Sequence, residues 1–389
     1  MKRNNSRIAA TLLLAATPLA ALAQSSVTIY GVVDNALVYS SSQNGAHNVY
    51  MRSGNLSASK IGFKGSEDLG GGLQAFFQLE NGFDADTGAM SSANTLFNRQ
   101  SFVGLSSKSA GALTIGRQYT PYYLYVGAIG STTVLTGATG AHPGDVDALD
   151  TSVRSSNAIS YSSPVIGGAQ VSALYGMGET AGSIATGNAW SMALKYNVNA
   201  WNFAVGFQHL NRGTGSATWG SSTATANIPN SAINAGYQTA NSAQMVAAAA
   251  RYTIDKLMLG AGYSVAQYKP GSGSLFTQAV KFQTAGAFST YQWSPALTLA
   301  AGYSYTFANK GNGISTAANY HQLALQETYA FSPRTALYFL QAYQLAGGST
   351  LASNGSIIHA LAAVGDSQNS TASSGKSQTV VMAGIRHSF

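Results

Sequence analysis

The chain of 389 residues contains no cysteine, which excludes disulfide cross-links and thiolate metal sites. Charged residues make up only 8% of it, yet after residue 23 no run of about 18 apolar residues is present that could form a transmembrane helix. Mean hydropathy is close to neutral at +0.04. This value is typical of strands in which apolar and polar residues alternate.

The first residues have the three parts of an export signal. A basic start is followed by an apolar run over residues 8–20 and by the small-x-small sequence Ala21-Leu22-Ala23. The apolar run is too short for a membrane anchor, so we predict that residues 1–23 are a cleaved signal peptide and that 24–389 form one domain. The basic residues at the start are Lys2, Arg3 and Arg7.

The net charge does not favour nucleic-acid binding. The whole chain carries +7, and three of its 20 basic residues lie in the signal, so the mature formal charge is +7 − 3 = +4. The remaining basic residues form no cluster in a helix or an arm. Glycine is abundant, with 43 residues, but Gly70-Gly71-Gly72 lacks the following Lys-Ser/Thr of a phosphate-binding loop and indicates a turn.

The end of the chain alternates in character and stops on an aromatic residue. Counting back by twos from Phe389 gives a mostly apolar face, whereas the residues between them are polar or small. A strand of this kind separates lipid from water. The apolar face consists of Val381, Ala383, Ile385, His387 and Phe389, and the other of Met382, Gly384, Arg386 and Ser388.

Strand-like segments recur along the whole mature chain, joined alternately by short and long connections. Seven short turns and eight long loops make fifteen connections, and therefore sixteen strands. An even number is required if both termini lie on the periplasmic side. The short turns are at 66–71, 108–110, 164–167, near Asn199, near Asp255, 291–295 and 332–333. The long loops are 41–48, 84–95, 120–155, 178–187, 211–241, 269–277, 308–319 and 346–377.

The clearest single strand is predicted over 297–307. Its apolar set, which includes Tyr303 and Phe307, faces lipid, and its small or polar set, which includes Ser304 and Thr306, faces the lumen. The sequence therefore predicts an all-β, 16-stranded antiparallel transmembrane barrel in the bacterial outer membrane.

Several segments closely resemble strands of the general diffusion porins of Gram-negative bacteria, most of all the β-proteobacterial branch. The resemblance implies passive diffusion of small hydrophilic solutes and ions, a homotrimer, contact with outer-membrane lipid and lipopolysaccharide, and a third loop folded into the barrel. It also implies an assembly signal at Ile385, His387 and Phe389 for the barrel-assembly machinery. The matching segments are 26–31, 57–73, 77–80, 96–105, 113–118 and 384–389.

The resemblance also implies a narrow zone with opposed charges. The third long loop, 120–155, carries Asp145, Asp147 and Asp150, the densest acidic cluster of the mature chain. Alternation alone places Lys60 and Lys64 in the lumen, opposite in phase to Ile61 and Phe63. The resemblance assigns the basic wall to Lys60, Arg99 and Arg154. Lys60 stands where an arginine is usual, and a lysine is a mobile point charge, so the resemblance does not define the shape of the electric field across the pore.

Two charged residues do not fit the alternation. Arg99 is in phase with the lipid-facing Val103 and Leu105, and we predict that a bulge or a late start of pairing brings it into the lumen. Glu327 is in phase with Leu325 and Tyr329, and its position close to a short turn predicts the headgroup level.

The predicted function is a general porin with weak anion preference, without enzymatic activity, cofactor or metal. The six histidines show no metal-ligand spacing, and no motif nominates a catalytic triad. Two alternatives stay open at this point. A substrate-specific channel of the same fold would show saturable block, and an adhesin or receptor barrel would use the loops 211–241 and 346–377 as its binding surfaces.

Overall fold

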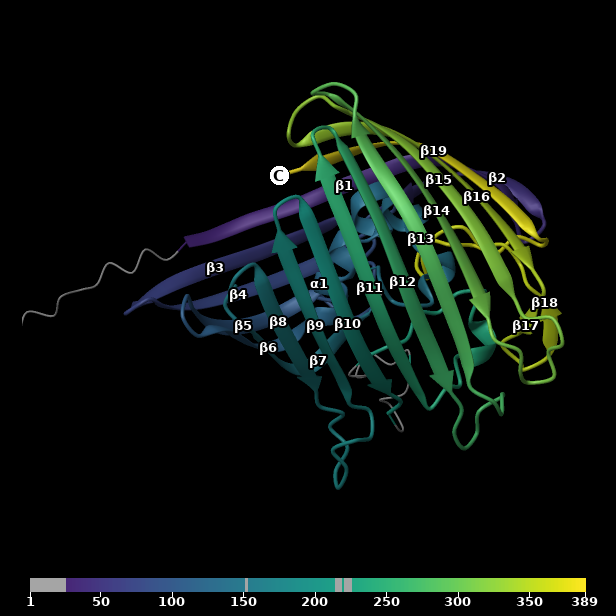
Figure 1. The fold of residues 1–389 in the computed structure, drawn as a ribbon, viewed down its shortest axis with the longest axis horizontal. Coiled ribbons are helices and arrows are strands. Elements are labelled where there is room, and N and C mark those ends of the chain that lie inside the picture. Colours follow the sequence, from purple (N-terminus) through teal and green to yellow (C-terminus); the bar gives the residue numbers. More distant parts are fainter. Residues whose placement is uncertain (1–25, 151–152, 214–218, 220–225) are drawn as a thin grey trace, which may run out of the picture.

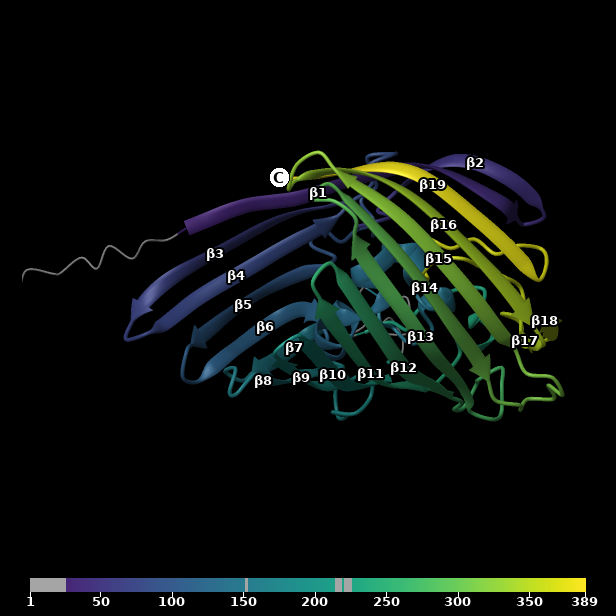
Figure 2. The ribbon, with the colours of Figure 1, turned by 45° about the horizontal axis from the view of Figure 1, so that its top comes forward.

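The structure is a computed structural model that describes residues 26–150, 153–213, 219 and 226–389. The predicted signal peptide lies outside these residues. Strands form one closed antiparallel barrel of sixteen strands around a lumen, which Figure 1 and Figure 2 show from two directions. No helix among the described residues is long and apolar enough to cross a membrane.

The sixteen wall strands follow one another in chain order as seventeen segments, because one wall strand is interrupted. They are β1 (Ser26–Gln43), β2 (Ala46–Ser53), β3 (Lys60–Gly70), β4 (Leu73–Gly82), β5 (Gln100–Ser107), β6 (Gly111–Tyr119), β7 (Arg154–Ser162), β8 (Ala169–Gly176), β9 (Ala189–Val198), β10 (Trp201–Asn211), β11 (Ser242–Ile254), β12 (Leu257–Lys269), β13 (Val280–Gln292), β14 (Leu297–Ala308), β15 (Asn319–Ala330), β16 (Thr335–Gly347) and β19 (Ser377–Ser388). Between β16 and β19 a small hairpin is formed by β17 (Ser349–Leu351) and β18 (Ile357–His359). The loop after β6 contains the short helix α1 (Pro121–Tyr125) and several single helical turns.

Strands β2 and β3 form one wall strand that is interrupted over residues 54–59. β1 pairs with β3 through its first half and with β2 through its second half, while its other edge pairs with β19 and closes the barrel. The buried carboxylate of Asp34 holds the interruption, accepting hydrogen bonds from the backbone N–H groups of Asn55, Leu56 and Ser57 at 2.9–3.2 Å and from the hydroxyl of Tyr338 at 2.7 Å. This side chain therefore shapes the wall at the closure.

The side chains alternate between the two faces as the sequence predicts. On β14, Tyr303 is exposed on the outside, whereas Ser304 and Thr306 are buried on the inside. On β1, Val27 and Leu37 project outward, and so do Ile385 on β19 and Phe389 directly after it. The lipid-facing and lumen-facing sets of these strands are confirmed.

The seven predicted short turns lie at one end of the barrel, although β3 continues to Gly70, so that the first turn is Gly71-Gly72 instead of 66–71. The first predicted long loop, 41–48, is wrong. β1 and β2 continue through this stretch and meet in a two-residue turn at Asn44-Gly45, both with positive φ (50° and 101°). An Asn-Gly pair favours this tight hairpin turn because both residues tolerate the left-handed conformation. The Asn-Gly pair in the sequence therefore predicts a tight hairpin at this position and not a long loop.

The third long loop is folded into the barrel over its described residues 120–150. Thr120 caps α1 by accepting a hydrogen bond from the N–H of Tyr123, and Figure 1 labels the helix inside the ring of strands. Further on, Ala141 O accepts a hydrogen bond from Gln322 on β15 (2.7 Å), and Val146 O accepts one from Tyr268 on β12 (2.7 Å). The loop thus crosses the lumen from β6 to the opposite wall.

Two more loops bend inward over the third loop. In the last loop, Ala363 forms a pair of hydrogen bonds with the amide of Gln344 on β16, and Gly365 O accepts one from the N–H of Gly144 in the third loop. In the loop between β10 and β11, Asn234 is buried and donates to the hydroxyl of Tyr268. These parts of the two loops are packed inside the barrel, which disfavours the alternative in which both loops act as external binding surfaces.

Candidate pore constriction

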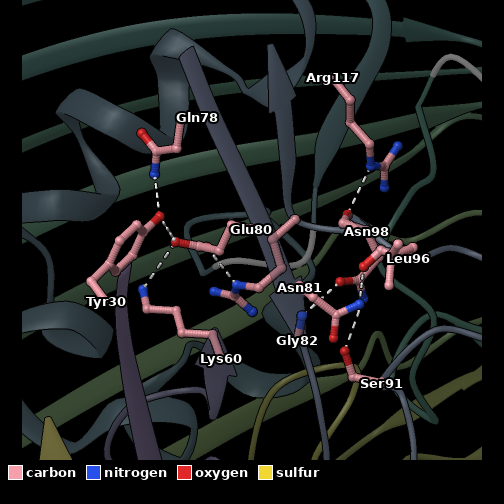
Figure 3. A network of polar contacts seen from close by, with 11 residues as sticks. Tyr30, Lys60, Gln78, Glu80, Asn81, Gly82, Ser91, Leu96, Asn98 and Arg117 are labelled. Atoms are coloured by element: carbon pink, nitrogen blue, oxygen red, sulfur yellow. Dashed lines mark hydrogen bonds and ion pairs between the residues drawn. The ribbon is translucent and has the colours of Figure 1, made fainter. Parts of the chain in front are cut away.

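A buried carboxylate, Glu80, organises one wall of the lumen. Glu80 lies on β4 opposite Gly62 of β3, and its carboxylate oxygens contact Lys60 Nζ at 3.7 Å and Arg99 Nε at 2.8 Å. The hydroxyl of Tyr30 donates to Glu80 at 2.8 Å and accepts from Gln78 at 2.6 Å (Figure 3). Two of the predicted basic residues are therefore paired with one acid that the sequence analysis did not select.

The position of Arg99 follows from where β5 begins. Regular pairing starts at Gln100, so Arg99 precedes the strand, while its N–H donates to Glu80 O at 3.1 Å. The alternation of side chains along a strand therefore does not apply to Arg99. Its side chain turns inward to Glu80 and is 4% exposed. The late start of pairing brings Arg99 to the lumen, as the sequence analysis allowed.

Two of the arginines contact the same aromatic ring, that of Tyr119. The Cζ atoms of Arg99 and Arg154 lie 5.8 and 5.2 Å from the ring centroid of Tyr119. Tyr119 ends β6 and pairs with Arg154, the first residue of β7. Both guanidinium groups thus make cation–π contacts with this ring, which do not neutralise their charge.

Arg117, which the sequence analysis did not select, is held next to Arg154. Its Nε donates to Asn98 O at 2.7 Å and its Nη1 to Ser156 Oγ at 2.6 Å. The amide of Asn98 is itself fixed, accepting from Gly82 N and donating to Ser91 Oγ, both at 2.8 Å (Figure 3). The β6–β7 register shifts between Gly116 and Gln118, so strict alternation does not predict on which face Arg117 lies.

The three predicted acidic residues of the third loop do not act as one wall. Asp145 is fully buried, and its carboxylate accepts a hydrogen bond from the N–H of Asp150 at 2.9 Å. Asp147 is 1% exposed and is bound by His142 and by Ser264 of β12. Of the three residues, Asp150 alone lines the cavity that contains Lys60 and Arg99. Asp145 and Asp147 instead make hydrogen bonds in the packing of the loop.

The pair His142–Asp147 lies within the third loop, and its carboxylate joins the loop to the far wall through Ser264 of β12. The Nδ1 atom of His142 lies 2.5 Å from Asp147 Oδ2, and the hydroxyl of Ser264 donates to the same oxygen. Burial alone would lower the pKa of His142, but the Asp147 carboxylate outweighs it and raises this pKa. Burial acts to raise the pKa of Asp147, and His142 with Ser264 overcomes it, so this pKa is lowered.

These two shifts predict that the anchoring of the loop depends on pH. The Asp147 contribution is present above the ordinary aspartate pKa and is lost as the pH falls through the lowered one. The His142 contribution is complete below the ordinary histidine pKa and is lost as the pH rises through the raised one. Anchoring should therefore be complete between about pH 4 and 6.5. Single-channel current noise should be lowest in this pH window and should rise at higher pH. In the His142→Gln variant the noise should not rise at higher pH.

Two open cavities contain most of the charged groups of this region. The larger, of about 1460 Å³, is lined by Lys60, Arg99 and Arg386 and by Glu80, Asp150 and Asp366. The second, of about 1160 Å³, is lined by Arg117 and Arg154, and no described residue of its lining is acidic. Gln368 of the last loop lines both cavities. The last loop thus contributes directly to the boundary between them.

The structure therefore places some predicted site residues apart from the others. Lys64 faces inward and lies with its Nζ 5.4 Å from the ring of Tyr30, but it is not in the lining of either cavity. Glu327 lies on the outer face between Leu299 and Phe339, two residues before Tyr329 at the short-turn end of β15. Its predicted position at the headgroup level stays a prediction.

Three further lining residues were missed for different reasons. Glu80 and Arg386 lie in phase with lumen-facing residues, so alternation could have found them. Asp366 could not have been found, because it belongs to a loop whose inward fold depends on contacts with β16 and β19.

The residues at the end of the chain lie at the barrel closure. The N–H and C=O groups of Phe389 exchange hydrogen bonds with Gly31 at 3.1 and 3.0 Å, and the His387 ring contacts Thr335 Oγ1 at 2.8 Å. Ile385, His387 and Phe389 are exposed on the outer face. Their predicted role in assembly stays a prediction.

A closed sixteen-stranded barrel with an in-folded third loop and a charged lumen defines the class of transmembrane channel-type barrels. The sequence model of the family described as Gram-negative porin matches residues 9–347. The chain therefore belongs to the Gram-negative porin family and is an outer-membrane protein.

Curated relatives match over part of their length. An outer membrane porin protein of Bordetella pertussis is 37% identical over 41% of this chain and 45% of its own. Outer membrane porin protein 32 of Delftia acidovorans is 36% identical over 38% of this chain and 43% of its own. The chain thus spans less than half of the length of these two relatives. Major outer membrane protein P.IB of Neisseria gonorrhoeae is 29% identical over 83% of this chain and 89% of its own.

Solved structures share the fold at low sequence identity. The anion-selective porin from Comamonas acidovorans has a TM-score of 0.71 at 22% identity, covering 94% of this chain and 100% of that one. A trimer form of OmpT from Vibrio cholerae has a TM-score of 0.63 at 17% identity, covering 94% and 99%. These similarities confirm the predicted barrel architecture.

Proposed function

We propose that the protein is a porin through which small hydrophilic solutes and ions cross the outer membrane by passive diffusion, with a preference for anions. The cavity lined by Arg117 and Arg154 carries this proposal, because no described residue of its lining is acidic. Over both cavities the lining has five cationic side chains and three carboxylates. The charge that dominates the narrow zone decides ion selectivity.

The residues that we propose to decide ion selectivity differ from those predicted from the sequence, in which three cations of the wall face three aspartates of the third loop. Lys60 and Arg99 share Glu80, so much of their charge is compensated locally. Asp145 and Asp147 are buried in the loop packing and add little negative field to the cavities. Arg117 and Arg154 thus supply most of the uncompensated charge, and the preference for anions follows from them. A solved structure that shares the fold is an anion-selective porin.

The mature protein, cleaved after residue 23, tests this function in a planar bilayer. We expect stepwise conductance and, in a salt gradient, a zero-current potential of the sign for anion preference. A cation-preferring potential would contradict the assignment to Arg117 and Arg154, and absence of conductance in folded, heat-modifiable protein would contradict the porin function itself. Saturable block by one solute would instead identify a substrate-specific channel.

We also propose that the functional unit is a homotrimer assembled through the β1 side of the barrel. Val27, Ile29 and Leu37 project from β1 and are 57–66% exposed in the single barrel. A solved structure with the same fold is a trimer form. Conductance should arrive in groups of three equal steps, and detergent-solubilised protein should have three times the mass of one chain. Single, independent steps would contradict the trimer. The exposed face of Phe389, His387 and Ile385 fits recognition by the barrel-assembly machinery.

A further inference from the structure

Four of the glycines in the wall from β10 to β14 face inward. They are Gly206 on β10, Gly262 on β12, Gly286 on β13 and Gly302 on β14. Each lies two residues from a buried residue of the inner face, and these buried residues are Gln208, Ser264, Thr284 and Ser304. None of the four glycines has a positive φ, so the backbone does not require glycine there. Glycine inside a strand often marks a place where another segment approaches closely.

At Gly302 the space of the missing side chain is taken by a residue of the third loop. A methyl group added to Gly302 would lie 2.3 Å from Leu135 Cδ2, whereas carbon atoms in contact are about 3.5–4.0 Å apart. Leu135 is 3% exposed and packs in a cluster with Met258, Phe288 and Ala300. Its side chain cannot turn away without leaving this cluster. The loop itself would therefore have to move by roughly 1 Å to restore a normal contact.

Gly206 and Gly286 receive other parts of the loop. A methyl group at Gly206 would lie 3.1 Å from side-chain atoms of Tyr122 and Val126 and 3.2 Å from the Cα atom of Tyr122, so the backbone of α1 lies directly against β10. A methyl group at Gly286 would lie 3.3 Å from Nε2 of His142. These distances are slightly below normal contact. The third loop thus contacts the wall at three glycines in turn, first on β10, then on β14 and then on β13.

Gly262 lies among these positions but receives no residue of the loop. It pairs with Gly286, and the nearest neighbours of a methyl group at Gly262 would be Ala248 O at 3.4 Å and Ala249 Cβ at 3.7 Å. Both are atoms of the adjacent strand at ordinary contact distance. The close approach of the loop is therefore specific to the three other glycines. We call Gly206, Gly286 and Gly302 the contact glycines.

The segment that packs against Gly302 forms part of the boundary of the larger cavity. Its residues in that lining are Thr132, Thr133, Val134, Leu135, Gly137 and Ala138. The N–H of Ala138 donates to Asn55 O at 2.9 Å, which holds the end of the segment at the interruption of the wall. Because the wall closes the side behind the segment, a displacement away from β14 takes it toward the lumen. The distance between loop and wall therefore affects the width of the cavity.

We propose that the contact glycines are positioning residues that set the size limit of the channel, because they allow the third loop to lie close to the wall. This inference rests on the proposed channel function and adds the solute size limit to it. The contact glycines lie on β10, β13 and β14, whereas Arg117 and Arg154, which carry the proposed ion preference, lie on β6 and β7. Size limit and ion preference are thus set by different parts of the wall and should change independently.

The test adds one methyl group at a time. Gly302→Ala should lower the single-channel conductance and the rate of liposome swelling, with a larger loss for a disaccharide than for a monosaccharide, because the larger sugar fills more of the pore. Gly206→Ala and Gly286→Ala should cause smaller losses, in line with their smaller overlap. The matched control Gly262→Ala should cause none. The zero-current potential in a salt gradient should be that of the unchanged protein in all four variants.

Two further measurements identify the contact as the cause. Leu135→Ala removes the atom that the new methyl group would meet, so Gly302→Ala combined with Leu135→Ala should regain the conductance that Gly302→Ala alone loses. Amide hydrogen exchange of the folded protein in detergent should be faster over residues 132–142 in Gly302→Ala and unchanged in Gly262→Ala, and this readout does not depend on conductance.

The outcomes separate the contact glycines from the channel function. Equal losses in Gly302→Ala and Gly262→Ala would overturn the proposal, and so would unchanged conductance and unchanged exchange in a folded, heat-modifiable Gly302→Ala protein. Absence of conductance in the unchanged protein would contradict the channel function, and with it the size limit. In that case a difference in exchange between the two variants would still establish the contact of the loop with Gly302.

Discussion

Replacing Arg117 and Arg154 together by glutamate is expected to reverse the ion preference of the channel. Both residues line the cavity in which no described lining residue is acidic, and the double change turns two positive charges there into two negative ones. An ideally selective pore develops about 59 mV in a tenfold gradient of a monovalent salt. We expect the zero-current potential to cross zero and change sign, by tens of millivolts, in a planar bilayer.

The matched control places the same change of charge elsewhere. Lys256→Glu with Arg334→Glu alters two exposed residues in short turns, outside both cavities, and should shift the potential much less because salt screens exposed charges. If the two double variants shift the potential equally, the net charge of the protein rather than the arginine cavity decides selectivity. Arg117→Gln with Arg154→Gln should give an intermediate value close to zero.

Replacing Asp147 by alanine is expected to release the third loop from the far wall. The change leaves the buried His142 without its carboxylate and removes the acceptor of Ser264. Breaking a buried ion pair by removing one partner costs about 3–5 kcal/mol. We expect this cost to fall on the loop, so that single-channel conductance rises, open-channel noise increases, and liposome swelling detects larger sugars than before.

Two variants make this result specific. Ser264→Ala removes one hydrogen bond to the same carboxylate and should have a smaller effect in the same direction. Asp84→Ala removes an acid from the loop after β4 and should change neither conductance nor noise. The barrel should stay heat-modifiable in every case, because its strand pairing does not involve Asp147. Unchanged conductance and noise in a folded Asp147→Ala protein would show that the other contacts of the loop suffice to hold it.

The strands of this barrel were predictable because each carries its own periodic pattern. β14 follows the predicted strand 297–307 within one residue, and its two faces are as expected. A strand in lipid has to present apolar side chains at every second position, so the local sequence contains the information. The Asn44-Gly45 hairpin was local as well, and its sequence signal was present but was outweighed by the polar composition around it.

The charged lumen was predictable only in part. Lys60 and Glu80 follow from alternation, whereas Arg99 and Arg117 depend on where pairing starts and where the register shifts. Asp147 carries the same local signal as Asp150, yet one is tied to β12 and the other lines the larger cavity. Local sequence does not distinguish them, because their surroundings come from strands that are distant in the sequence.

The sequence by itself determined the class of fold, the number of strands, the direction of their side chains and the identity of the long third loop. These properties repeat with period two or depend on turn residues, and neighbouring residues suffice to define them. The tertiary structure alone decided which charges share the lumen, which are neutralised, and that the last loop bends inward onto Gln344. Such pairings depend on contacts between distant segments, and the chain must close into a barrel before these segments meet.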